Sequence, residues 1–131
     1  MKKLLCVMLA VNILLAFTGC ATIRHEKDTS VKLYMVRDSI TVTEELTGEE
    51  AEVILDILNG KKAYGNFLST RWSCPFGFEL AIRIDETVYL IAQDDCNVIW
   101  QEKSTNVYRI SAEEKETLEQ IFLAHGSEHR N

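Results

Sequence analysis

The chain has 131 residues, of which 47% are hydrophobic and 26% are charged, and its formal net charge is −6. This length fits one modest domain and excludes two large ones, because a typical domain takes roughly 100–200 residues. The composition lies near the average of soluble proteins, which excludes a disordered or low-complexity chain. The acidic balance, 20 Asp and Glu against 14 Lys and Arg, argues against a nucleic-acid partner, which requires a basic face.

The first 19 residues have the pattern of an export signal. Two lysines follow Met1, an apolar run from Leu4 to Phe17 is interrupted only by Asn12, and small residues come next. This run is shorter than the about 18 apolar residues that a stable membrane-spanning helix needs. We therefore predict that residues 1–19 are a signal peptide that is removed, with a retained single-span anchor as the alternative.

The next feature is the motif Phe17-Thr18-Gly19-Cys20. It resembles the lipobox of bacterial lipoproteins, in which an apolar residue, a small residue and Gly or Ala precede an obligatory Cys. The resemblance implies that the Cys20 sulfur carries a diacylglycerol and anchors the protein to a membrane outside the cytoplasm. Ala21 follows, which in that family implies the outer membrane if the host has one. Phe17 departs from the Leu most often found there, and the motif implies neither a fold nor an activity.

Two cysteines remain once Cys6 is removed and Cys20 is lipidated. In an oxidising compartment, the pair Cys74 and Cys96 indicates a disulfide. Alternating residues on both sides of a turn at Asp85-Glu86 predict a hairpin between them. The two cysteines are one residue out of register in that hairpin, a gap that a bulge or a three-residue loop would close. Redox-active thiols or a metal pair are the alternatives, although no CxxC motif is present.

The rest of the chain is predicted to be a tether, one domain and a tail. Residues 20–30 are polar and predict a solvated tether after the lipidated cysteine, residues 31–126 predict one α+β domain, and residues 127–131 predict a frayed tail. Within the domain, strands are expected in residues 31–46, 97–102 and 106–110, besides the hairpin.

Two helices are expected where capping boxes occur. Each has a Ser or Thr followed three residues later by Glu, at Thr47 to Glu50 and at Ser111 to Glu114. The order of elements predicts an antiparallel sheet of four to six strands, with two helices packed on one face and one disulfide.

Few residues point to catalysis or metal binding. After the predicted signal the histidines are His25 in the tether, and His125 and His129 near the tail, which leaves no central base to activate Ser or Cys. The acidic stretch Asp94-Asp95 lacks the spacing of an EF-hand, so a solvated turn is favoured over a cation site. We therefore expect no catalytic residue, no metal and no cofactor.

The best candidate for a partner surface is the stretch that contains Phe67, Arg71, Trp72 and Phe76. Trp, Arg and Phe are residue types that dominate binding hot spots. The preferred alternative is a loop that packs over one sheet edge and is pinned by Cys74.

Together these patterns predict a lipid-anchored cell-envelope protein that is a noncatalytic binding or structural module, not an enzyme. Its expected partners are the membrane, through Cys20, and an unidentified envelope protein. The alternative function is an inhibitor of an extracellular hydrolase of the protease or lysozyme type, with the loop from Phe67 to Phe76 entering the active site.

Overall fold

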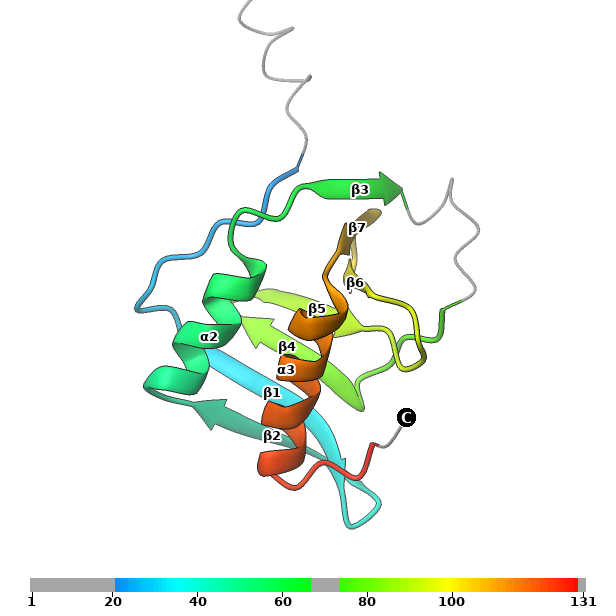
Figure 1. Cartoon of the computed structure of the whole chain (residues 1–131). Coiled ribbons are helices and arrows are strands. Elements are labelled where there is room, and N and C mark those ends of the chain that lie inside the picture. The colour runs from blue at the N-terminus through cyan, green and yellow to red at the C-terminus, as the bar shows by residue number, and fades with distance from the viewer. Residues whose placement is uncertain (1–20, 67–73, 130–131) are drawn as a thin grey trace, which may run out of the picture.

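The structure is a computed structural model that describes residues 21–66 and 74–129. The elements follow in the order β1 (Val31–Arg37), β2 (Ile40–Leu46), α2 (Glu49–Leu58), β3 (Ala63–Asn66), β4 (Leu80–Ile84), β5 (Thr87–Ile91), β6 (Val98–Gln101), β7 (Asn106–Arg109) and α3 (Ala112–Ala124). Both helices lie over the same face of the sheet (Figure 1). The predicted α+β class is confirmed.

The sheet has seven strands, in the order β2-β1-β4-β5-β6-β7-β3, and every pairing is antiparallel. The sheet therefore has at least one strand more than the four to six that were predicted. The missed strand is β3, which pairs with β7 at the sheet edge and has a register shift between Ala63 and Gly65. A short strand with a glycine and an irregular register lacks the alternation by which strands are recognised.

Two of the hairpins have two-residue turns. Arg37 pairs with Ile40 across Asp38 and Ser39, which have φ values of 52° and 62°. Positive φ at both central residues gives a turn whose twist matches that of the flanking strands. In the second hairpin Ile84 pairs with Thr87, so the turn at Asp85-Glu86 has two residues, as predicted.

The core lies between the sheet and the two helices. Alternate residues of the central strands point to the helices and are fully buried, among them Leu33, Ile82 and Ile91. Leu55 of α2 and Phe122 of α3 pack against them. Each such side chain contributes roughly 1.5–3 kcal/mol on burial, so this layer is the main source of stability. A smaller cluster on the opposite face contains Ala92, Val98 and Val107.

The two helices begin differently. In α3 the predicted capping box forms, because the Glu114 amide donates to Ser111 Oγ at 3.0 Å and the Ser111 amide donates to the Glu114 carboxylate at 2.8 Å. In α2 the predicted box is wrong: the N-cap is Gly48, with φ of 65°, and no side chain caps the helix. The left-handed backbone of Gly48 moves the helix start past Thr47, so the Thr47 hydroxyl is not in capping position.

The predicted tether is wrong for residues 21–25, which belong to the domain, while Cys20 lies outside the described residues. The Ala63 amide donates to the Ala21 carbonyl at 2.7 Å, and the Ile23 amide donates to the Lys61 carbonyl at 2.9 Å. Ile23 is only 3% exposed and joins the main core. His25 is held by Asn59, whose side chain contacts both its amide and its carbonyl. The domain therefore includes residue 21, ten residues before the predicted boundary.

The predicted tail is also wrong for residues 127–129, while residues 130–131 lie outside the described residues. Ser127 is buried, and the Glu128 amide donates to the Val36 carbonyl at 2.9 Å. The Glu128 carboxylate accepts from the amides of Asp38 at 2.7 Å and Ser39 at 3.2 Å. The chain after α3 therefore closes onto the β1–β2 turn.

Within residues 21–66 and 74–129, neither helix is long and apolar enough to cross a membrane.

Candidate functional site

Most of the predicted site residues lie outside the described residues. This applies to Cys20, the predicted lipidation site, and to Phe67, Arg71 and Trp72 of the candidate partner surface. The remaining member of that surface, Phe76, is half-buried and packs edge-on against Trp100 at 5.9 Å between ring centroids. Both rings lie against the small cluster on the sheet face opposite the helices, so Phe76 has a packing role.

Cys74 and Cys96 form a disulfide, as predicted, with sulfurs 2.08 Å apart and Cα atoms 6.1 Å apart. The register gap is closed neither by a bulge in the hairpin nor by a longer turn. Instead β5 ends at Ile91, and Cys96 lies in the loop that leads to β6. The Gln93 amide donates to the Pro75 carbonyl at 2.9 Å and holds the two connected segments side by side.

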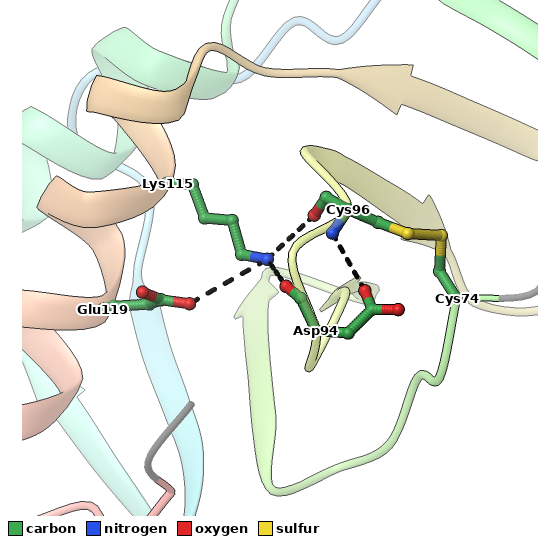
Figure 2. Close-up of a disulfide and its surroundings, with 5 residues drawn as sticks. All are labelled: Cys74, Asp94, Cys96, Lys115 and Glu119. Atoms are coloured by element: carbon green, nitrogen blue, oxygen red, sulfur yellow. Dashed lines mark hydrogen bonds and ion pairs between the residues drawn. A yellow bond between two sulfur atoms is a disulfide. The ribbon is translucent and has the colours of Figure 1, made fainter.

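A buried lysine holds the disulfide loop to α3 (Figure 2). Lys115 is only 4% exposed, and its Nζ donates to the carbonyls of Asp94 and Cys96, the latter at 2.8 Å. Glu119, one turn along α3, lies 4.0 Å from the same Nζ. A buried ammonium is tolerated only with such partners. Lys115 therefore has a structural role and links the disulfide to α3.

The same loop contains the one group of potential metal ligands found among the described residues. The two sulfurs and a carboxylate oxygen of Asp94 lie within 4.8 Å of one another. The sulfurs are bonded to each other, whereas a metal binds the thiolate. Asp94 Oδ1 accepts from the Cys96 amide at 2.9 Å, which gives this carboxylate a structural role in the turn.

A groove of about 620 Å³ lies between α2 and α3. Helix α2 contributes Glu49, Glu50 and Val53 to it, and α3 contributes residues on one face. The full α3 lining is Glu113, Glu116, Thr117, Gln120, Ile121 and Ala124. The groove thus has an apolar floor and a rim of four carboxylates, and neither lysine nor arginine lines it.

The acidity extends over the whole helix layer. Helix α2 carries four acidic residues and no basic one, and α3 carries four acidic residues and one lysine. That lysine is Lys115, whose ammonium is buried on the inner side. The outer surface of both helices is therefore negatively charged, which the net charge of the chain alone does not reveal.

His125 contacts one of the rim carboxylates, Glu50. Its Nε2 lies 2.8 Å from the Glu50 carboxylate, and its Nδ1 contacts the Glu44 carboxylate of β2. Arg37 of β1 donates to Glu44 at 2.6 Å and also to the His125 carbonyl. A ring that donates from both nitrogens is positively charged. Accordingly, the hydrogen bond with Glu44 raises the pKa of His125, and the same bond lowers the pKa of Glu44.

The sequence patterns do not predict this junction of His125 with Glu44 and Glu50. His125 was expected beside a frayed tail, but its partners Glu50 and Glu44 lie 75 and 81 residues away. No local pattern encodes such a contact.

The His25 ring also has a contact: its Nε2 lies 2.7 Å from the Tyr89 hydroxyl. Burial lowers the pKa of His25, so this ring favours the neutral form.

No protein-family model matches the chain, and neither the curated proteins nor the solved structures contain a match.

Proposed function

We propose that this chain is a lipid-anchored protein of the cell envelope and that its domain is a noncatalytic binding module. The observation that carries the proposal is the motif Phe17-Thr18-Gly19-Cys20 directly before Ala21, the first residue that the structure describes. Lipidation needs a cysteine thiol at the new N-terminus, and two or three acyl chains suffice for stable anchoring without a spanning helix. The disulfide supports a location outside the reducing cytosol.

The position of Ala21 defines which end of the domain would face the bilayer. Ala21 bonds to Ala63 at the start of β3, so lipid on the preceding residue brings this edge of the sheet to the membrane. Exposed side chains at this edge include Arg24, Lys62 and Tyr64. Cationic and aromatic side chains are suited to a headgroup region. The anchoring membrane is the outer one if the host has two.

The noncatalytic part of the proposal rests on His125 and the groove. Both nitrogens of the His125 ring contact carboxylates, so neither is available as a base for a nucleophile. Among the described residues neither His nor Cys lines the groove, and the one hydroxyl there, on Thr117, donates to the Glu113 carbonyl at 2.8 Å. An open groove with an apolar floor and a charged rim is suited to binding a partner.

The anchor is tested by substitution of Cys20. In the native host, we expect Cys20→Ser to abolish acylation, measured by metabolic labelling with a fatty acid, and to remove most of the protein from the membrane fraction. Inhibition of the lipoprotein signal peptidase with globomycin should leave the uncleaved wild-type precursor. The matched control is Cys6→Ser, which changes a cysteine within the predicted signal but keeps the motif. Unchanged membrane fractionation of Cys20→Ser would contradict the proposal.

A further inference from the structure

We propose that the groove between α2 and α3 binds a cationic amphipathic helix of a partner protein. This inference rests on the proposed function, since it names the partner of the binding module. The binding groove is defined by the residues given above: Val53, Ile121 and Ala124 in the floor, and Glu49, Glu50, Glu113 and Glu116 in the rim.

The shape of the groove fits a helix. Glu50 at the start of α2 contacts His125 after α3, and Lys61 after α2 bonds to Glu114 at the start of α3 at 2.7 Å. The two helices are therefore antiparallel, and the groove runs between them. Its α3 side extends from Glu113 to Ala124, about 17 Å at 1.5 Å per residue. Three turns of a third helix match this length, with apolar side chains on the floor.

The charge of the rim favours a basic partner. Glu113 and Glu116 are one turn apart at the start of α3, and Glu49 lies at the start of α2, toward the other end of the groove. Among the described residues none of these three carboxylates has an ion-pair partner, whereas Glu50 is held by His125. Like charges three or four residues apart on a helix repel each other. A basic partner would relieve this repulsion and pair with the carboxylates.

The same charges disfavour two other occupants. A second copy of the chain would have to bring its own acidic helix layer to the groove, and the two layers would repel. An anionic lipid surface would be repelled for the same reason. A helix that places Lys or Arg along both sides of an apolar stripe satisfies both the rim and the floor.

The test uses residues 20–131 with Cys20→Ser, which retains every residue that the structure describes. The probe is a fluorescent peptide of about 18 residues, a length at which an amphipathic Lys/Leu helix forms in water. We expect saturable binding by fluorescence anisotropy that weakens with added salt. A peptide of the same composition with its apolar stripe scrambled should bind at least about fivefold more weakly, because it cannot cover the floor.

Matched double substitutions separate the groove from general charge attraction. Glu113→Gln with Glu116→Gln removes two rim carboxylates and should weaken binding about fivefold, as expected for loss of two exposed ion pairs. The control is Glu26→Gln with Glu86→Gln, which changes the net charge equally at exposed positions outside the groove. It should change affinity by less than about twofold. The proposal would be overturned if both double substitutions weakened peptide binding equally, or if neither of them weakened it.

A third variant fills the groove. Thr117 is exposed within it, and Thr117→Arg would place a cation among the rim carboxylates and block the peptide. Thr43→Arg, which adds the same charge at an exposed position outside the groove, should change affinity by less than about twofold. Thermal unfolding checks that each variant folds. If Thr117→Arg does not fold, the double glutamine substitutions still show whether the peptide binds in the groove. If Cys20 is acylated but the peptide does not bind, only this inference is refuted. If the peptide binds but Cys20 is not acylated, only the anchor is refuted.

Discussion

His125 shows how one side chain joins distant parts of the chain. Its ring lies between Glu44 of β2 and Glu50 of α2, and its carbonyl accepts from Arg37 of β1. Beside this junction, Glu128 binds the amides of the β1–β2 turn. The carboxylates that face the ring favour its protonated form, and the nearby Arg37 pairs with one of them. The strength of this junction must therefore depend on pH.

The sign of the pH dependence follows from the two pKa shifts. The pKa of His125 is raised, so its stabilising contribution is complete below the unfolded pKa of about 6.5 and is lost as the pH rises through the higher folded value. The pKa of Glu44 is lowered, so its contribution is present above the unfolded value and is lost as the pH falls through the folded one. The junction is therefore strongest in mildly acidic solution.

We expect His125→Gln to reduce the free energy of unfolding by up to about 1 kcal/mol at mildly acidic pH, since the contacts are partly exposed. The difference from the wild type should shrink as the pH rises above neutrality, because the wild-type ring then loses its charge. Urea unfolding between about pH 5 and pH 9 measures this. A difference that stays constant over that range would show that the ring acts without its charge.

At the scale of the elements, the two helix starts show what a local pattern encodes. Both have the same Ser/Thr-x-x-Glu spacing, but only the box at Ser111 forms. At the other start Gly48 is the N-cap, and Glu50 contacts His125. Spacing alone does not distinguish these outcomes, because the backbone of Gly48 and a partner 75 residues away determine the second one.

The difference gives a matched pair of substitutions. Ser111→Ala should destabilise the protein by about 1 kcal/mol, because it leaves the Glu114 amide without its acceptor. Thr47→Ala removes the same kind of hydroxyl from an exposed residue that does not cap a helix. It should lower the free energy of unfolding by only about a few tenths of a kcal/mol. Thermal or urea unfolding of both variants provides the comparison. Equal losses would mean that the Thr47 hydroxyl also stabilises a helix start.

The elements predicted correctly are those with local signals. Strands β4 and β5 alternate in hydrophobicity on both sides of a two-residue turn, and α3 has both a capping box and a glycine stop at Gly126. The features that were missed depend on distant contacts. The binding groove needs the acidic faces of two helices to lie together, and the anchoring of His25 needs Asn59, 34 residues away. Neither pairing leaves a periodic trace in the sequence.

At the scale of the whole molecule, the disulfide and Lys115 connect the two faces of the sheet. Cys74 and Phe76 lie over the small cluster on one face, while α3 lies on the other. Lys115 of α3 binds the Cys96 carbonyl next to the disulfide. The loop closed by the disulfide spans 22 residues of sequence separation, and closing it restricts the unfolded chain.

We expect the double substitution Cys74→Ala with Cys96→Ala to lower the free energy of unfolding by about 3 kcal/mol, on the loop-entropy account. The fold should persist, because the main core is separate from the cysteines. Chemical unfolding measures the loss, and intact mass should show the wild-type protein about two hydrogens lighter before reduction. Two thiols that react freely with an alkylating reagent in the native protein would contradict the disulfide.

If Cys20 carries lipid, as proposed, the hydrogen bond between Ala21 and Ala63 also limits where the domain can meet a partner. A ten-residue flexible tether would let the domain move by roughly 17 Å from its attachment point. With lipid on Cys20 and the next residue already bonded into the sheet edge, that freedom disappears. The domain then searches only in the plane of the membrane, within a layer about one domain diameter deep. Its encounters become two-dimensional, and a partner fixed in the same membrane gains a higher effective concentration.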